Sequence, residues 1–290
     1  MNIHGLIDIL GVSIGAVAYQ KIRYFSRDMQ SKTIEELIGE ILIELPKISG
    51  EGYYKIEVEY LGQKQNAGYR IEQWKGSEYP TIIYHHGAAE GSYDFSFNRI
   101  LKKNKTEIPA NLIAIQALFN HSNAEFFKNI AYFSKYTLML AASVLIIEGL
   151  ISELRKLGKE KITVTGISLG GFVTNLHFAH FNSADIYKPL LAGTRMGEVF
   201  FDSAYAKITD DKAKKESEKL KAILNIEGLF MKREQNKLFP LNAKFDRIVK
   251  YDNQSKAYRA ENLKTIPYGH ATGALQFGAL RRFILEGINE

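Results

Sequence analysis

The spacing of hydrophobic and polar residues predicts a helix at 33–45 and a hairpin after it. Apolar residues recur every three or four positions between residues 33 and 45, which is typical of an amphipathic helix. Thr33 and Glu36 form a capping-box pattern at its start. Two segments with alternating apolar and polar residues follow at 53–61 and 68–74. Their alternation, with a Gly- and Asn-containing turn between them, predicts an antiparallel hairpin.

From residue 80 onward, short apolar runs alternate with helical stretches. A longer apolar stretch between the second and third runs is too short to span a bilayer and predicts a buried core helix. Apolar runs that do not alternate, joined by helices, indicate a mostly parallel sheet covered on both faces. The chain is therefore expected to be an α/β protein. The runs lie at residues 81–84, 112–115, 162–165, 186–192, 238–241 and 263–266.

We divide the chain into a helical N-terminal segment, residues 1–50, and one α/β domain, residues 51–290. Residues 195–236 show no strand pattern, and closely spaced Lys and Glu at 210–221 predict a solvated helix. This insertion precedes the strand expected to carry an acidic residue. It forms either a lid over a pocket or a layer of surface helix.

The apolar stretch near the N-terminus allows several interpretations. Ala16-Val17-Ala18 resembles a signal-peptidase site, but no Lys or Arg precedes the stretch and Asp8 interrupts it. The stretch is also too short for a membrane-spanning helix. A helix docked on the domain, or a peripheral membrane contact through residues 1–20, accounts for it better.

Composition limits the classes of binding partner and the cellular compartment that we expect. The chain has 38 Lys and Arg against 32 Asp and Glu, a net charge of +6 that is spread without a block of like charges. No basic stripe interleaved with aromatics is present, so nucleic-acid binding is not expected. Cysteine is absent, which excludes disulfides, thiolate nucleophiles and cysteine-ligated metals. Its absence fits a reducing compartment, and we expect a cytoplasmic protein.

The clearest chemical signal is the segment 166–170, which reads Gly-Ile-Ser-Leu-Gly. It lies between a predicted strand and a helical run, the context that the G-x-S-x-G motif of a serine nucleophile requires. Gly166 and Gly170 leave room for close packing, because side chains there would collide with the neighbouring strand or helix. The sharp turn exposes the hydroxyl of Ser168 and aims the amide of Leu169 toward a developing oxyanion.

A serine hydroxyl is a weak nucleophile and needs an adjacent base. His270 comes just past the last predicted strand, which places it at the same edge of the sheet as Ser168. The acid that orients the imidazole should follow a neighbouring strand, and Asp246 does. Asp252 and Asp202 are the rival acids.

A second oxyanion donor is expected in the loop after the strand at 81–84. Small residues there let a backbone amide approach a substrate oxygen, and Ala88 is the natural donor beside Leu169. His86 and Gly87 would shape the loop. A phosphate-binding loop is disfavoured because no G-x-x-x-x-G-K-[ST] pattern follows.

These motifs together resemble the α/β-hydrolase superfamily of esterases, lipases and peptidases. The resemblance implies a mostly parallel, eight-stranded sheet flanked by helices, and acyl-enzyme chemistry that uses no metal or organic cofactor. The helical N-terminal leader departs from the minimal fold. The resemblance rests on four motifs in the family order: His86-Gly87, the segment 166–170, Asp246 followed by Ile248-Val249, and Gly269-His270.

We therefore expect a serine hydrolase that cleaves small-molecule carboxylic esters through an acyl-enzyme on Ser168, with Asp246 and His270. An acyltransferase, thioesterase or peptidase would use the same residues, and the sequence does not separate them. A non-catalytic binding module with this fold is the remaining alternative. The aromatic candidates for an acyl pocket are Phe126, Phe127, Phe200 and Phe201.

Overall fold

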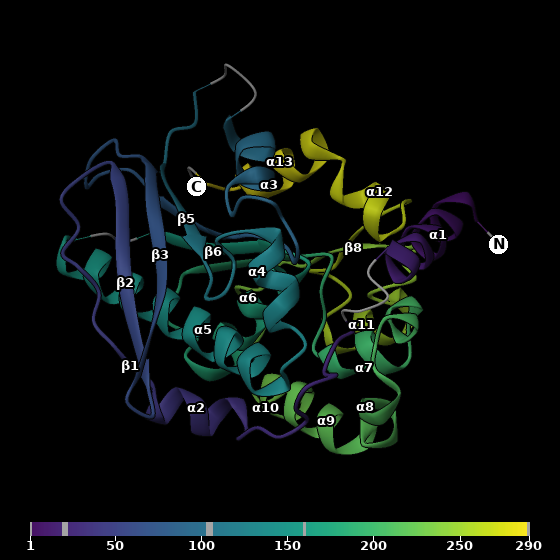
Figure 1. Cartoon of the computed structure of the whole chain (residues 1–290). Helices are drawn as coiled ribbons and strands as arrows, with labels where there is room; N and C mark the ends of the chain where they lie inside the picture. Colours follow the sequence, from purple (N-terminus) through teal and green to yellow (C-terminus); the bar gives the residue numbers. More distant parts are fainter. Residues whose placement is uncertain (1, 19–22, 103–106, 159–160, 289–290) are drawn as a thin grey trace.

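The computed structural model describes residues 2–18, 23–102, 107–158 and 161–288. Within these residues, one sheet of nine strands runs through the molecule in the order β1-β2-β3-β5-β4-β6-β7-β8-β9 (Figure 1). In chain order the strands are β1 (Leu42–Ile43), β2 (Gly52–Tyr60), β3 (Gln63–Gln73), β4 (Thr81–His85), β5 (Asn111–Gln116), β6 (Ile162–Ile167), β7 (Ile186–Leu190), β8 (Leu241–Ala243) and β9 (Lys264–Ile266).

The sheet is antiparallel at one end and parallel over the rest. β1, β2 and β3 pair antiparallel, and β3 pairs antiparallel with β5. The pairs from β5–β4 to β8–β9 are parallel. Parallel strands bring their carboxyl ends to one edge of a sheet, so the loops after β4, β6, β8 and β9 can meet there. The predicted α/β fold with a mostly parallel sheet is confirmed.

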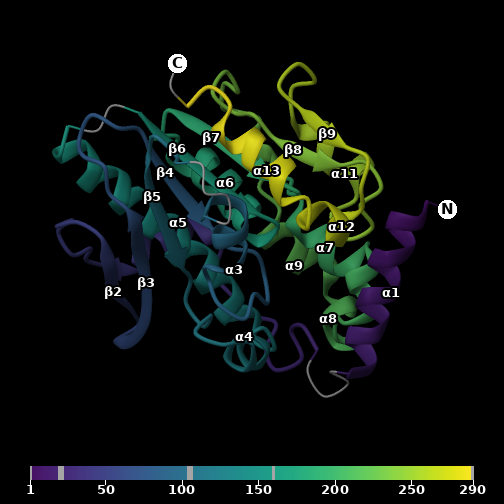
Figure 2. The same ribbon diagram turned by 90° about the horizontal axis from the view of Figure 1, so that it is seen from above.

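Helices cover both faces of the sheet (Figures 1 and 2). Every residue of β4, β5 and β6 is buried, and successive residues such as Ile82 and Ile83 point to opposite faces and join separate cores. The helices of the main domain are α3 (Phe95–Phe97), η1 (Asn98–Lys102), α4 (Asn123–Asn129), α5 (Phe133–Lys156), α6 (Leu169–His180), α11 (Tyr251–Gln254), η3 (Ser255–Ala257), α12 (His270–Ala274) and α13 (Phe277–Leu285).

α5 is the predicted core helix between the second and third apolar runs. The expectation that this stretch is too short to span a bilayer is wrong, because by length and composition alone the helix could cross a membrane. Most of its residues are nevertheless buried in the core, as predicted. It packs against α6 and against α2 (Ile34–Glu40). Burial against these neighbours explains why this helix is apolar on nearly all sides.

The helix predicted at 33–45 is shorter than expected, and the N-terminal segment 1–50 is not entirely helical. The predicted capping box is present: Glu36 N–H donates to Thr33 Oγ1 at 3.2 Å, and Thr33 N–H donates to Glu36 Oε2 at 2.8 Å. However, α2 ends at Glu40, because Ile41 adopts an extended backbone and the next two residues pair with β2 as β1. This short edge strand also explains why the described sheet has nine strands rather than eight.

The hairpin is present, but its turn is tighter than predicted. β2 and β3 are joined by Leu61 and Gly62 alone, and both have positive φ, 50° and 73°. Two such residues make the type of turn that matches the natural twist of a hairpin. β3 therefore begins at Gln63, within the residues expected to form the turn.

α1 (Ile3–Ala18) packs on the main domain beside α12 and the short helix η2 (Ala204–Lys207) (Figures 1 and 2). Its Asp8 is buried, while five large apolar side chains remain exposed: Ile3, Leu6, Ile7, Leu10 and Ile14. A membrane contact through residues 1–20 stays a prediction, and residues 1, 19 and 20 lie outside the described part of the chain.

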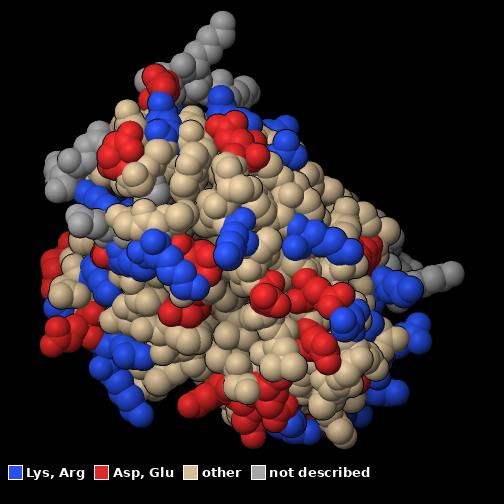
Figure 3. All heavy atoms as spheres, turned by 90° about the vertical axis from the view of Figure 1, so that its left-hand side faces the viewer, with Lys and Arg blue, Asp and Glu red and all other residues tan. Residues whose placement is uncertain are grey.

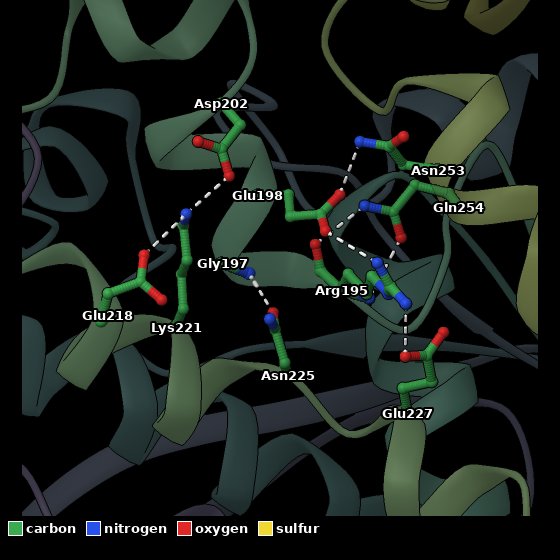
Figure 4. A network of polar contacts seen from close by, with 10 residues as sticks. All are labelled: Arg195, Gly197, Glu198, Asp202, Glu218, Lys221, Asn225, Glu227, Asn253 and Gln254. Carbon is green, nitrogen blue, oxygen red and sulfur yellow. Dashed lines mark hydrogen bonds and ion pairs between the residues drawn. The ribbon is translucent and has the colours of Figure 1, made fainter.

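The predicted insertion at 195–236 contains helices that polar contacts tie together (Figure 4). Arg195 pairs with Glu227 at 2.7 Å, Gly197 N–H donates to Asn225 Oδ1 at 2.8 Å, and Lys221 pairs with Asp202 at 2.8 Å. These contacts favour a fixed helical layer over a lid. The helices are α7 (Met196–Phe201), η2, α8 (Asp211–Lys215), α9 (Ser217–Leu224) and α10 (Glu227–Phe230).

Basic and acidic side chains are interspersed on the face that Figure 3 shows, which includes β2 and β3. Several pair with one another, for example Lys64 with Glu57 at 2.6 Å and Lys102 with Glu72 at 2.6 Å. Mixed charges of this kind do not form the continuous basic surface that a nucleic acid needs. The expected absence of nucleic-acid binding and the cytoplasmic location stay predictions.

Candidate active site

Ser168 occupies a strained turn between β6 and α6. Its φ and ψ are 54° and −111°, a backbone conformation that costs roughly 1–3 kcal/mol for a residue other than glycine. Two backbone hydrogen bonds hold it: Ser168 N–H donates to Leu190 O at 2.9 Å, and Phe172 N–H donates to Ser168 O at 3.0 Å. The side chain is only partly buried, so the hydroxyl can meet a substrate.

The glycines on either side of Ser168 are needed for steric reasons. A Cβ at Gly166 would lie 2.5 Å from the carbonyl carbon of Gly170, and a Cβ at Gly170 would overlap the His85 carbonyl oxygen. Contacts with backbone atoms cannot be relieved by moving a side chain. The structure thus places both glycines where helix α6 crosses close to β4 and β6.

The structure brings Ser168, His270 and Asp246 together. His270 is the first residue of α12, after β9, and its Nε2 lies 2.8 Å from Ser168 Oγ. Its Nδ1 lies 2.6 Å from Asp246 Oδ2, in the loop after β8. The other oxygen of Asp246 accepts the amides of Ile248 and Val249 at 2.8 and 2.7 Å. The serine hydroxyl can therefore donate to a ring nitrogen whose partner nitrogen is held by a fixed carboxylate.

The surroundings of His270 favour its protonated form. Burial alone would lower the pKa of the imidazole, but the charge and hydrogen bond of Asp246, together with the charge of Asp8, raise it above its ordinary value. Burial also raises the pKa of Asp246. An imidazole with a raised pKa takes a proton from a hydroxyl more readily.

Asp8 is a functional candidate that the sequence did not reveal. Its Oδ2 accepts the amide of His270 at 2.8 Å and that of Arg247 at 3.1 Å, and its Oδ1 accepts the amide of Ala271 at 2.9 Å. The carboxylate thus holds the residues after Asp246 and the start of α12 in one place. The one available signal was a lone carboxylate in an apolar stretch, which we took only as evidence against a signal peptide.

The loop after β4 is shaped by a second residue without a predicted role, Glu90. Its Oε1 accepts the amide of Gly87 at 2.6 Å, and its two oxygens accept the hydroxyl and the amide of Ser96, each at 2.8 Å. A Cβ at Gly87 would lie 3.5 Å from the carbonyl oxygen of Ile167, the residue before Ser168. The loop that contains Ala88 therefore lies against the turn that carries the serine.

His86, the expected loop-shaping residue, is buried and contacts the backbone of this loop. Its Nδ1 lies 2.8 Å from Gly87 O, and Ala117 N–H donates to its Nε2 at 3.3 Å. Asn120 Nδ2 lies 3.1 Å from the same Nε2. Burial lowers the pKa of His86 to about 4, so the ring is neutral at neutral pH and donates from Nδ1.

Of the two expected oxyanion donors, Leu169 directly follows Ser168, and Ala88 lies in the loop after β4. Leu169 is the first residue of α6, so its amide is one of those that have no partner inside the helix. Ala88 follows Gly87 at the tip of the loop. The rival acids lie elsewhere: Asp202 pairs with Lys221, and Asp252 lies within α11.

Comparison with known proteins identifies the fold. No family model matches the chain, and no curated protein matches it by sequence. Acetyl xylan esterase 1 from Thermoanaerobacterium sp. JW/SL YS485 matches with a TM-score of 0.57 and 16% identity over 92% of this chain and 98% of that one. Est1E from Butyrivibrio proteoclasticus matches with a TM-score of 0.56 and 18% identity over 83% of this chain and 100% of that one.

A larger protein shares the same fold. The acylaminoacyl peptidase of Pyrococcus horikoshii matches with a TM-score of 0.54 and 14% identity over 82% of this chain, which spans only 41% of the peptidase. At these identities the likeness concerns the fold and not the substrate. The fold that the four sequence motifs predict is confirmed, and the chain is an α/β-hydrolase-fold protein.

Proposed function

We propose that the protein is a serine hydrolase that cleaves carboxylic esters through an acyl-enzyme on Ser168. The observation that supports this most is the continuous hydrogen-bonded series from Ser168 Oγ through His270 to Asp246, at 2.8 and 2.6 Å. A strained serine, a base within hydrogen-bond reach and a fixed acid are the parts that nucleophilic acyl transfer requires.

The reaction proceeds in two halves. Ser168 Oγ attacks the ester carbonyl carbon as its proton passes to His270 Nε2, and the C=O electron pair moves to the oxygen. The pair then returns, the bond to the alkoxy group breaks, and His270 protonates the departing alcohol. In the second half, water attacks the carbonyl carbon of the acyl-enzyme as its proton passes to His270. The bond to Ser168 Oγ then breaks, the acid is released, and Ser168 regains the proton from His270.

The amides of Ala88 and Leu169 would stabilise the negative oxygen that forms in each half. Backbone amides are effective here because they are already oriented before the charge appears, and one such donor contributes roughly 10²- to 10³-fold in kcat. Asp246 keeps Nδ1–H of His270 directed toward itself, so that Nε2 faces the serine. No residue outside this arrangement is needed for the proton transfers.

Ser168→Ala tests the proposal. The variant removes the nucleophile without adding bulk, and we expect its kcat/KM on p-nitrophenyl acetate to fall by at least about 10⁴-fold. Ser77→Ala, at an exposed serine in the turn before β4, is the matched control and should keep full activity. Equal activity of Ser168→Ala and the wild type would contradict the proposal. Faster hydrolysis of p-nitroanilides than of p-nitrophenyl esters would instead indicate a peptidase.

A further inference from the structure

A cavity of about 240 Å³ lies between α1 and the loops of the candidate active site. Ile7, Gly11 and Val12 of α1 line one side of it. Ala89 and Ile248, from the loops after β4 and β8, and Ala271, at the start of α12, line the other. The N-terminal helix therefore closes a space that the main domain alone would leave open.

Three residues that line the cavity are direct neighbours of the proposed catalytic machinery, although Ser168, His270 and Asp246 are not among the lining residues. Ala271 follows His270, Ala89 follows the expected oxyanion donor Ala88, and the amide of Ile248 donates to Asp246. The cavity therefore lies next to His270, whose Nε2 is 2.8 Å from Ser168 Oγ, and within reach of an acyl group bonded to that oxygen. The position suits the acyl part of an ester.

The chemistry of the walls suits an apolar chain. The one carboxylate at the cavity, Asp8, already accepts three backbone amides and is not available to a ligand's polar group. Phe127, one of the four aromatic candidates from the sequence, also lines the cavity. Two of the other three, Phe126 and Phe200, are buried in the core.

We propose that this cavity binds the acyl chain of the substrate, that α1 is its wall, and that the protein prefers esters of unbranched apolar acids of roughly eight to ten carbons. The inference rests on the proposed function. An apolar cavity of about 150 Å³ holds one benzene ring of six carbons, so a cavity about 1.6 times larger holds a chain of this length. Each methylene that enters it should raise kcat/KM about two- to fourfold, up to that length.

Gly11 offers a direct test because it borders the cavity and has no side chain. A Cβ there would meet no atom within 4 Å, so a leucine can enter the space without displacing the protein. Gly39 in α2 is a matched control, since it is also an exposed helical glycine whose Cβ would meet no atom within 4 Å, and it does not line this cavity.

The experiment compares p-nitrophenyl octanoate with p-nitrophenyl acetate, which share a leaving group and so report on the acyl side. Octanoate has six more methylenes than acetate, so at twofold each we expect the octanoate-to-acetate ratio of kcat/KM to be at least about 60 in the wild type. Gly11→Leu should lower this ratio by about tenfold or more while acetate hydrolysis changes less than about threefold. Gly39→Leu should leave the ratio unchanged. Ile7→Ala enlarges the cavity and should shift the optimum to longer chains.

The outcomes separate this inference from the proposed function. The acyl site would be overturned, and the hydrolase left intact, if the wild type is active but the octanoate-to-acetate ratio is unchanged in Gly11→Leu. The optimal acyl length would also have to be unchanged in Ile7→Ala. If Gly11→Leu changed kcat/KM according to the alcohol group of acetate esters, and not according to the acyl chain, the acyl site would be overturned as well. Absence of activity toward every ester in the folded wild type would overturn the proposed function itself.

Discussion

Two buried carboxylates, Asp246 and Asp8, hold the residues around His270. Asp246 bonds to the imidazole, whereas Asp8 bonds to the backbone amides of His270 and Ala271. Both negative charges favour the imidazolium that forms when Ser168 loses its proton, and both raise the pKa of His270. Asp8 reaches no reacting atom of the triad, so we regard it as a positioning residue.

Asp8→Asn should change the pH dependence of the reaction. His270 acts as a base only when neutral, so kcat/KM rises with pH, and its midpoint should lie above 6.5 because the pKa of His270 is raised. The substitution removes a negative charge that favours the protonated ring, so the pKa falls and the midpoint moves to lower pH, by roughly one unit or less. The measurement is the pH profile of kcat/KM for p-nitrophenyl acetate.

A control separates this effect from a loss of structure. Asp202→Asn removes a carboxylate that pairs with Lys221 in the helical insertion, and it should leave the midpoint in place. If Asp8→Asn lowers only the melting temperature and the midpoint stays where the wild type has it, Asp8 serves folding alone.

The sequence predicted the catalytic candidates that lie in a local motif or directly after a predicted strand. Ser168 lies in a recognisable pentapeptide, and Asp246 and His270 each follow a predicted strand. Asp8 was not predicted, because its hydrogen bond with the His270 amide joins residues 262 positions apart, and no local sequence pattern indicates such a contact. Glu90 was not predicted for a different reason. Its partners Gly87 and Ser96 are close in sequence, but the loop conformation that brings them together has no simple sequence motif.

Among the elements, α7 and the segment before it depend on side chains from α11. Gln254 is buried, its Oε1 accepts Arg195 N–H at 3.0 Å, and its Nε2 donates to Arg195 O at 2.8 Å (Figure 4). The amide thus pairs with both backbone groups of Arg195, whose carbonyl also accepts the amide of Glu198 at 3.1 Å. Tyr205 and Ile208, which also line the cavity, belong to the insertion that begins at this point.

Gln254→Ala should destabilise the protein by about 1–3 kcal/mol, because it removes the partner of the Arg195 N–H and one of the two hydrogen bonds to the Arg195 carbonyl. The measurement is the free energy of unfolding by urea. Lys219→Ala, which removes an exposed pair with Glu216, is the comparison and should cost no more than about 0.5 kcal/mol. Equal losses in the two variants would show that the contacts of Gln254 contribute no more than a surface ion pair.

The ends of helices and strands were predicted less well where pairing between strands determines them. The apolar spacing at 33–45 continues smoothly past Glu40, yet Leu42 and Ile43 leave the helix to pair with β2. A two-residue strand has too little sequence of its own to be recognised. The buried strands β4, β5 and β6 were predictable, because burial on both faces requires an uninterrupted apolar run.

At the scale of the whole molecule, the fold brings the N-terminal helix and the residues that follow β6, β8 and β9 to one site. Parallel strands deliver Ser168, Asp246 and His270 to the same edge of the sheet, and α1 returns from the N-terminus to pack on α12 (Figures 1 and 2). The sequence predicted the convergence of the strand ends. It did not predict that the N-terminal helix completes the site, since an apolar helix can equally dock on a protein or on a membrane.

The most direct test of the central claim is covalent labelling with a fluorophosphonate, which reacts with activated serines. We predict that the wild type takes up one label, which peptide mapping by mass spectrometry places on Ser168, and that folded Ser168→Ala takes up none. Labelling of Ser168→Ala at the wild-type rate, or a wild type that is folded and does not react, would contradict the assignment of Ser168 as the nucleophile.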